Sequence, residues 1–557
     1  MTGPAPTLIR GALVLDGTGR PGETGDVLLA DGRIQRVGGR LDELRASATE
    51  VIDADGLAIA PGLIDMHAHS DLAVLTDPVH LAKVSQGVTT EVVGQDGLSY
   101  APATPAAIDV LREQLAGWNG IPPGLDLGWE TVGGYLDAVD RARPAANVAA
   151  LVPQGTVRLD VVGTADRPAT AAEIAAMCAV VDRGMRDGAF GMSSGLTYVP
   201  GMFAGTDELV ALCEVVAAHR GVYVPHQRSY GAGALEAYAE MIEVASRSGV
   251  ALHLAHATMN FGVNRGRARE LVALLDDAVA SGVDLTFDTY PYLPGSTTLA
   301  ALLPSWAAAD GPAATLDRLL DPAARERIAY ELDVVGSDGC HGVPVEWDTI
   351  EISGVRDPAL SGRVGRTVAA LAIESGHPAS TVALDLLVAD RLGTGILQHV
   401  GDEANVRTMM AHPRHTGGSD GILVGDKPHP RAWGTFPRYL GHYVRDEGVL
   451  RLEDAIVHLS ARPAALLGLA DRGRIAPGMV ADVVLFDPST VADRATFAEP
   501  RRQATGIPWV FVAGEAVLAD GQRTGSRPGR ALRHGLLQSE QRAARRLQRS
   551  SGRLQQQ

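Results

Sequence analysis

A repeated pattern between residues 171 and 292 most strongly limits the folds open to this chain. A stretch with apolar residues at three-to-four spacing is followed by a glycine and then by a strand-like run, about every 30 residues. The glycines stand where a helix would end in a left-handed turn, and they are Gly188, Gly221, Gly249 and Gly282. This alternation predicts an α/β fold, a (β/α)8 TIM-like barrel whose active site lies at the carboxyl ends of the strands.

The two ends of the chain show a different pattern, with short β-branched runs closed by glycine turns over residues 8–37, 473–488 and 509–521. We therefore expect one small β-sandwich assembled from both termini. After Tyr292 the barrel rhythm breaks, which indicates an insertion before the last barrel strand. The predicted parts are 1–60 and 466–522 for the sandwich, 61–465 for the barrel with an insertion at about 293–410, and 523–557 for a flexible Arg/Gln-rich tail.

The composition fits a globular enzyme that acts on a small molecule, with 46% hydrophobic and 21% charged residues. A net charge of -17 argues against nucleic acid as a partner. The chain has no apolar run long enough to cross a bilayer, and its N-terminus lacks a basic region followed by an apolar run, so we expect neither a membrane partner nor secretion. Three widely spaced cysteines favour a reducing cytoplasm. The oligomeric state is left open.

The segment PGLIDMHAHSDL places His67 and His69 one residue apart at the end of an apolar strand. Strand side chains alternate, so both imidazoles face one side and can reach one divalent metal. His226 and His256 end two consecutive strand patterns and add two imidazoles to the same rim. The alternative for each pair is that the histidines are buried and hydrogen-bonded without binding a metal. His253 lies three residues before His256, and we expect it to point toward the outer helices without a ligand role.

Two carboxylates accompany these histidines, Asp96 in GQDG and Asp420 in GSDG. Each follows a predicted strand and precedes a glycine, so each is a candidate metal ligand. An Asp-Gly pair is also ordinary turn chemistry, and Asp338 in the suspected insertion is our example of a turn residue alone.

Hydrolysis follows from such a donor set, because a bound cation lowers the pKa of water toward about 7 and polarises a carbonyl. Asp420 would take a proton from the water and deliver it to the departing amine. Tyr198 could donate a hydrogen bond to the oxyanion, or simply pack in the core. Arg431 could grip a substrate carboxylate, or be solvated. Tyr290, Tyr292 and Ser296 are also predicted to line the pocket. The alternative is that their segment only forms a turn.

Several motifs together resemble the N-acyl-D-amino-acid deacylase (D-aminoacylase) family of the amidohydrolase superfamily, over roughly residues 8–530. They are PGLIDMHAHSD, GVTTEVVGQDG, HQRSYG, AHATM, DTYPYLPGST, GGSDG and PHPRAWGTFPRYLGHYV. The resemblance implies a zinc held tightly by His226 and His256, and a second, weaker metal position facing His67, His69 and Asp420. It also implies that Asp420 carries the proton and that Arg431 binds the substrate carboxylate.

The chain departs from the family pattern at two positions. Asp96 stands where the family has a metal-bridging cysteine, and a harder carboxylate should weaken the preference for Zn²⁺ over Mn²⁺ or Co²⁺. Thr258 stands where the family often has a lysine, which makes Thr258 a candidate contact to the substrate.

The resemblance implies cleavage of an N-acyl-D-amino acid to a carboxylate and a free D-amino acid, and it alone supports the D configuration. The same metal chemistry would serve a cyclic amidase of the hydantoinase or dihydroorotase kind. Those enzymes commonly bridge their metals with a carboxylated lysine, which has no counterpart at a comparable strand end here. A scaffold that kept the fold without turnover is the remaining alternative, and it predicts the loss of ligands.

Overall fold

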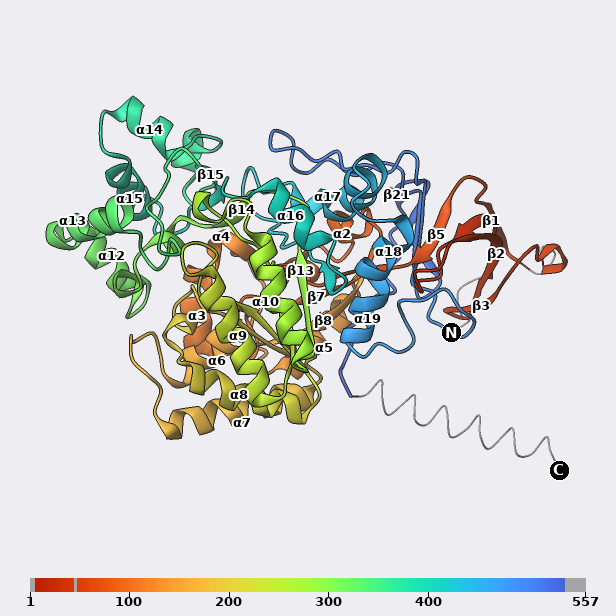
Figure 1. The fold of residues 1–557 in the computed structure, drawn as a ribbon, viewed down its shortest axis with the longest axis horizontal. Helices are drawn as coiled ribbons and strands as arrows, with labels where there is room; N and C mark the ends of the chain where they lie inside the picture. The colour runs from red at the N-terminus through yellow and green to blue at the C-terminus, as the bar shows by residue number, and fades with distance from the viewer. Residues whose placement is uncertain (1–5, 45–47, 536–557) are drawn as a thin grey trace.

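The computed structural model describes residues 6–44 and 48–535, and its centre is a closed barrel of parallel strands (Figure 1). β9 continues β8 after Leu151, and Ala68 pairs with Gly421 beyond the end of β6, so the wall closes. In the described part of the chain the wall has eight strands in chain order, which confirms the predicted fold class. They are β6 (Leu63–Asp65), β7 (Val88–Val93), β8 (Asn147–Ala150) with β9 (Val152–Pro153), β10 (Gly191–Gly195), β11 (Val222–His226), β12 (Ala251–Leu254), β13 (Leu285–Thr289) and β17 (His415–Gly417).

Helices cover the outside of the barrel, and their apolar faces pack on the strands. Four of these helices end before the glycines named above, and the first three are α7 (Ala171–Asp187), α8 (Thr206–Ala218) and α9 (Ala234–Ser248). Thr170 begins α7 with a capping box to Glu173, which satisfies two backbone donors of the first turn. Others on the barrel are α5 (Val132–Ala142), α6 (Gln154–Val161), α10 (Ala268–Ala280), α16 (Glu403–Met410), α18 (Leu452–Ile456) and α19 (Arg462–Leu466).

The glycines after these helices take the predicted left-handed conformation at Gly188, Gly249 and Gly282, but not at Gly221. There the preceding Arg220 has the positive φ, of 58°. Gly221 is needed for space instead, because a Cβ at this position would lie 2.5 Å from Cε of Met185.

Strands from both ends of the chain form one mixed sheet, the β domain, beside the barrel (Figure 1). β5 pairs with β18, so the N-terminal strands (red) and the C-terminal strands (blue) share a core that includes Ile9, Val27 and Val483. All strands of this domain join one hydrogen-bonded sheet: β1 (Thr7–Val14), β2 (Glu23–Ala30), β3 (Arg33–Gly38), β4 (Glu50–Asp53), β5 (Ala58–Pro61), β18 (Val483–Phe486), β19 (Trp509–Val512), β20 (Glu515–Ala519) and β21 (Gln522–Arg523).

An inserted segment, residues 295–398, separates β13 from α16, the helix before the last barrel strand, and has its own apolar core. It holds an antiparallel sheet of β14 (Gly295–Thr298), β16 (Gly395–Gln398) and β15 (Ile350–Gly354). Its helices are α11 (Ser305–Ala308), α12 (Pro312–Leu320), α13 (Pro322–Tyr330), α14 (Val368–Ser375) and α15 (Ala379–Ala389). We propose that the insertion ends near Gln398, earlier than the sequence-based bound of about 410, because α16 packs on α10 and on the barrel strands.

Residues 531–533 of the C-terminal tail pack against the barrel. Ala531 pairs with Val148 of the barrel, and the Leu532 side chain is buried. Arg533 forms ion pairs with Asp137 and Asp140 of α5. The rest of the predicted tail, residues 536–557, lies outside the described residues.

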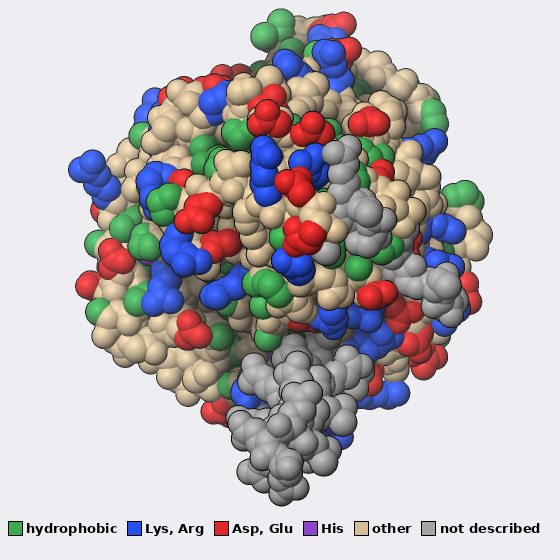
Figure 2. Space-filling model, turned by 90° about the vertical axis from the view of Figure 1, so that its right-hand side faces the viewer, with side chains coloured by type: hydrophobic (Ala, Val, Ile, Leu, Met, Phe, Trp, Pro, Cys, Tyr) green, Lys and Arg blue, Asp and Glu red, His purple; other side chains and the backbone are tan. Residues whose placement is uncertain are grey.

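The described surface on the side of the β domain carries charges of both signs (Figure 2). Figure 2 shows acidic and basic side chains interspersed over the described part of this face. No helix within residues 6–44 and 48–535 combines the length and the apolar character that a membrane span needs.

Candidate metal centre

All six predicted metal ligands lie at one mouth of the barrel. His67 and His69 follow β6, Asp96 follows β7, and Asp420 follows β17. His226 is the last residue of β11, and His256 comes two residues after β12. Each of the six residues is buried, with 7% or less of its surface exposed. Residues far apart in the sequence therefore meet at the carboxyl ends of parallel strands, where barrels of this kind hold their reacting groups.

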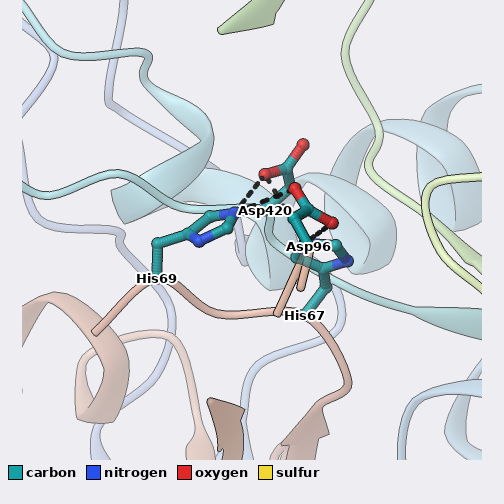
Figure 3. A group of neighbouring side chains, drawn as sticks. All are labelled: His67, His69, Asp96 and Asp420. Carbon is teal, nitrogen blue, oxygen red and sulfur yellow. Dashed lines mark hydrogen bonds and ion pairs between the residues drawn. The ribbon is translucent and has the colours of Figure 1, made fainter. Parts of the chain in front are cut away.

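The ligand atoms form two groups that share Asp96, and Figure 3 shows the first of them. In the first group, His69 Nε2 lies 3.1 Å from Asp420 Oδ1, and His67 Nε2 lies 3.4 Å from Asp96 Oδ1. In the second group, His226 Nδ1 lies 3.1 Å from His256 Nε2. The two carboxylate oxygens of Asp96 reach both of these rings, at 3.5 Å from His226 and 3.6 Å from His256. Asp96 is thus positioned between two convergent sets of donors.

Three of these ligands sit in the left-handed backbone region that residues other than glycine rarely adopt, with φ of 52° at Asp96, 31° at His256 and 48° at Asp420. Such strain is usually found at functional sites, where the surrounding structure enforces it. The Asp-Gly pairs at Asp96 and Asp420 are therefore true turns, and the same turns aim the carboxylates at the histidines. Asp338 behaves as the expected turn residue alone, since its Oδ1 accepts from the backbone N–H of Ser305.

The electrostatics of the cluster fit a divalent cation. Burial alone would lower the pKa of His67, but Asp96, Asp288 and Asp420 raise it well above its ordinary value. Burial would raise the pKa of Asp96, but His67 and His226 hold it well below its usual range. Among the described residues, both ring nitrogens of His67 and Oδ1 of Asp96 have no hydrogen-bond partner although they are buried. Imidazole nitrogens and carboxylate oxygens that converge in this way are a zinc donor set.

Asp288 supports the centre from below, and the sequence analysis missed it. Its Oδ1 accepts from the backbone N–H of His256 at 3.0 Å, and its Oδ2 lies 3.8 Å from Nδ1 of His67. Its carboxylate also contacts His253 Nε2 at 3.1 Å. The expectation that His253 points to the outer helices is therefore wrong, because its ring lies inside the barrel. A carboxylate that contacts a ligand imidazole fixes the orientation of the ring and makes it a better donor.

A buried lysine supports the opposite side of the same centre. Lys83 is fully buried and donates to Asp65 Oδ2 at 2.6 Å and to Ser419 Oγ at 2.8 Å. Asp65 Oδ1 in turn accepts from the backbone N–H groups of Ser419 and His67. These bonds tie the His67 loop to the Asp420 turn. Lys83 belongs to the short helix α2 (Leu81–Val84), where the sequence carries no signal for this role.

A pocket of about 680 Å³, the metal pocket, opens over the ligands. Three of the predicted substrate-binding residues line it, Thr258, Tyr290 and Ser296, together with Tyr198, the predicted donor to the oxyanion. The Tyr198 hydroxyl lies 3.2 Å from Thr297 Oγ1, and burial raises the pKa of Tyr198 above its ordinary value. Tyr198 is therefore a protonated hydroxyl at the edge of the centre.

Arg431 is fully buried beside the metal pocket, and its first contact is Asp420 rather than solvent. Its Nη2 lies 2.9 Å from Asp420 Oδ2, and its guanidinium stacks 4.4 Å above the Tyr290 ring. Nε and Nη1 have no hydrogen-bond partner among the described residues. Burial would raise the pKa of Asp420, but Arg431 and His69 lower it, so this carboxyl is ionised.

Tyr292 does not join the pocket, contrary to the expectation. Its hydroxyl donates to Asp493 Oδ2 at 3.4 Å, and its ring faces the guanidinium of Arg438 at 4.9 Å. It lies beyond the end of β13, where the alternation that would align it with Tyr290 no longer holds.

The inserted segment adds a pocket residue that sequence reasoning missed. His341 lines the metal pocket, has a positive φ of 58°, and packs edge-on against Tyr230 at 5.5 Å. Its Nδ1 is buried without a hydrogen-bond partner in the described part of the chain. Burial, together with nearby His226 and His256, lowers the pKa of His341 to about 3. His341 is therefore a neutral imidazole over the centre.

Comparisons with known proteins agree with this geometry. The amidohydrolase family model matches residues 50–522. D-aminoacylase of Alcaligenes xylosoxydans xylosoxydans is 36% identical over 95% of this chain and 98% of its own length, and the N-acyl-D-aspartate deacylase of the same organism is 34% identical over 95% of each. The chain also resembles a solved structure of N-acyl-D-glutamate deacylase from Bordetella bronchiseptica, with a TM-score of 0.80 and 34% identity over 95% of this chain and all of that one. That structure contains zinc and a phosphonate inhibitor that mimics the tetrahedral intermediate of the reaction. The chain therefore belongs to the amidohydrolase family, in the group that contains D-aminoacylase and the N-acyl-D-amino-acid deacylases.

Proposed function

We propose that the protein is a zinc-dependent hydrolase that cleaves the acyl amide of N-acyl-D-amino acids to a carboxylate and a free D-amino acid. The observation that carries the proposal is the pair of buried ligand groups that share Asp96 beneath one pocket. The metal would be held by Asp96, His226 and His256, with a second position at His67, His69, Asp96 and Asp420. When bound, zinc lowers the pKa of water toward about 7 and polarises the scissile carbonyl.

Asp420 is the proton carrier in this proposal. Its Oδ1 lies next to His69 at the centre, while its Oδ2 is neutralised by Arg431. An ionised carboxylate in this position can accept a proton from the attacking water at Oδ1. It can then deliver that proton to the amide nitrogen, which leaves as the free amine.

Two further side chains position the substrate. The Tyr198 hydroxyl is protonated and near the centre, so it can donate a hydrogen bond to the oxygen that becomes negative as water adds to the carbonyl. Nε and Nη1 of Arg431 are unpartnered and can bind the α-carboxylate of the amino acid. The backbone and side chains near Tyr290 and Ser296 then line the amino-acid end of the pocket.

The pocket favours amino acids with neutral side chains. Among the described residues that line it there is no lysine or arginine, and the family's lysine position is Thr258. The related deacylases named for N-acyl-D-glutamate and N-acyl-D-aspartate act on amino acids with a second carboxylate. Burying that carboxylate beside Asp96 and Asp420 without a cation would be costly, so we propose that this protein prefers neutral D-amino acids.

A substrate panel tests the proposal. The zinc-loaded protein is incubated with N-acetyl derivatives of leucine, methionine, glutamate and aspartate in both configurations, together with hydantoin and dihydroorotate. We expect free D-leucine and D-methionine to appear, with little release from the acidic or L-configured compounds. Opening of the cyclic amides alone would assign the cyclic amidase activity. If no compound is hydrolysed and the protein binds no metal, the protein is a non-catalytic scaffold.

A further inference from the structure

A second cavity lies directly beside the metal pocket, and none of the roles above uses it. It measures about 830 Å³ including its opening, and it is enclosed by α3 (Pro105–Gln114), α4 (Ala116–Asn119) and the α11–α12 part of the inserted segment. We call it the apolar cavity. It shares four wall residues with the metal pocket, Trp118, Thr197, Tyr198 and Ala301, so the two spaces lie on either side of these residues.

The lining of the apolar cavity suits a hydrocarbon. Aliphatic side chains and methyl groups make up most of its wall, among them Val110, Leu115, Met202, Ala300, Leu303 and Leu392. Its charged lining residues are Glu113 and Arg391, and the Glu113 carboxylate is paired with Arg356. A ligand with a charge or with many polar groups would lose its hydration there without gaining partners. An alkyl chain would gain from leaving water.

The wall between the two spaces consists of aromatic rings that touch the metal ligands. The Trp118 ring lies 5.0 Å from the His69 ring and 4.9 Å from the Tyr198 ring, and Tyr198 lies 5.0 Å from His226. The indole N–H of Trp118 has no hydrogen-bond partner among the described residues, so no bond to the protein fixes the ring. A group bound at the ligands is thus one aromatic ring away from the apolar cavity.

The amino-acid end of a substrate would point elsewhere. Tyr290 and Ser296, beside Arg431, line the metal pocket but not the apolar cavity. With the α-carboxylate at Arg431 and the scissile carbonyl at the ligands, the remaining arm of the substrate is its acyl chain. That arm starts at the wall formed by Trp118 and Tyr198.

We propose that the apolar cavity binds the acyl chain of the substrate, and that the protein therefore prefers N-acyl amino acids with medium or long alkyl chains over N-acetyl compounds. This inference rests on the proposed deacylase function and names its substrate class. Each methylene group that leaves water should increase kcat/KM by about two- to fourfold while the cavity has room. Between an acetyl and an octanoyl chain we expect an increase of at least about tenfold.

A chain-length series on one amino acid tests this. N-acetyl-, N-butyryl-, N-octanoyl- and N-dodecanoyl-D-leucine are compared by kcat/KM with the zinc-loaded protein. A rise from acetyl to octanoyl supports the proposal. Turnover of the acetyl compound with a flat or falling series overturns it while leaving the deacylase function intact. Failure to hydrolyse every member of the series overturns the proposed function as well.

Two matched variants, one that fills the apolar cavity and one that does not, test whether the cavity binds the acyl chain. Ala308→Phe places a ring at the cavity wall, whereas Ala313→Phe places the same ring on the exposed face of α12 nearby. The ratio of octanoyl to acetyl kcat/KM should fall at least about tenfold in A308F and stay at the wild-type value in A313F. Equal ratios in both variants would overturn the assignment.

A binding measurement does not depend on catalysis. Octanoate should raise the thermal unfolding midpoint of the wild type and of A313F, but not of A308F. If A308F unfolds at a much lower temperature than A313F before any ligand is added, a second variant replaces A308F in both tests. This variant is Val110→Phe on α3, which fills the cavity from the opposite wall. Octanoate stabilisation that survives in the filled variant would place the acyl chain outside the cavity.

Discussion

The barrel mouth and the inserted segment enclose the same pocket, but they contribute different kinds of residue. At the mouth, buried imidazoles and carboxylates come from strand ends, and groups such as Asp288 and Lys83 hold them in place through further contacts. The inserted segment has its own core. It offers the metal pocket a neutral imidazole, His341, and it offers the neighbouring apolar cavity the wall around Ala300 and Leu303. In the proposed function, the barrel carries the reaction, and the inserted segment helps the barrel loops to select the substrate.

The largest expected effect is on kcat, and it distinguishes the aspartates of two Ser-Asp-Gly turns, Asp420 at the barrel mouth and Asp338 in the inserted segment. Asp420→Asn removes the proton acceptor at the barrel mouth, and we expect kcat to fall by about 10³-fold or more. Asp338→Asn, in the inserted segment, keeps an oxygen that can accept from the Ser305 N–H, so kcat should stay within about twofold of the wild type. Steady-state assays on N-acyl-D-leucine measure both. Equal losses would mean that the division between the two regions is wrong.

The second effect concerns the metal. Asp96 faces both ligand groups, so Asp96→Ala should remove at least one equivalent of bound metal and reduce kcat/KM by about 10²-fold. Asp96→Cys should keep the metal and raise the preference for zinc over manganese, because thiolate is the softer ligand.

Elemental analysis of the purified variants, loaded with zinc or with manganese, measures this change. Asp338→Ala is the matched control and should bind the wild-type amount of metal. An Asp96→Ala protein with unchanged metal content would show that Asp96 is only a turn residue.

The third effect is smaller, because Asp288 acts through the ligands. Asp288→Asn keeps the shape and an oxygen for the His256 N–H but removes the charge beside His67, and we expect metal affinity to fall by about 10- to 100-fold. Competition with a chelator measures the affinity. Asp276→Asn removes a largely exposed carboxylate from the outer face of the barrel helix α10 and should leave the affinity unchanged.

Most of the ligands at the barrel mouth could be predicted from the sequence, because each is marked by a short motif at the end of a strand. A strand ends, a histidine or an Asp-Gly turn follows, and parallel strands bring these ends together. His67, His69, Asp96, His226, His256 and Asp420 were found in this way. The β domain was found because strand patterns at both termini share one period, although nothing in the sequence shows that they form a single sheet.

The errors at the mouth occur where a strand ends and alternation fails. His253 and His256 are three residues apart, which predicts opposite faces, but β12 stops at Leu254 and the positive φ of His256 turns the chain. Both rings therefore face the barrel interior. Tyr290 and Tyr292 are two residues apart, yet β13 stops at Thr289 and only Tyr290 lines the pocket.

Apart from Ser296, the pocket residues of the inserted segment could not be predicted, because their role depends on how one core packs against another. His341 stands in a glycine-rich turn whose sequence, SDGCHG, reads as an ordinary loop. Only the packing of that loop over the barrel brings its ring to Tyr230. Lys83 was missed for the same reason, since its partners Asp65 and Ser419 lie far away in the sequence.

His341 therefore gives the smallest and most selective prediction. Its neutral ring lines the pocket with one unpartnered nitrogen, so it can hydrogen-bond the substrate but is not among the converging metal donors. His341→Ala should raise KM about three- to tenfold, the worth of one hydrogen bond, while kcat and metal content stay near the wild type. His377→Ala changes an exposed histidine of the same segment and should alter neither constant. If His341→Ala instead lowers kcat and metal content together, the inserted segment takes part in the reaction itself, and the division of labour between the two regions fails at this residue.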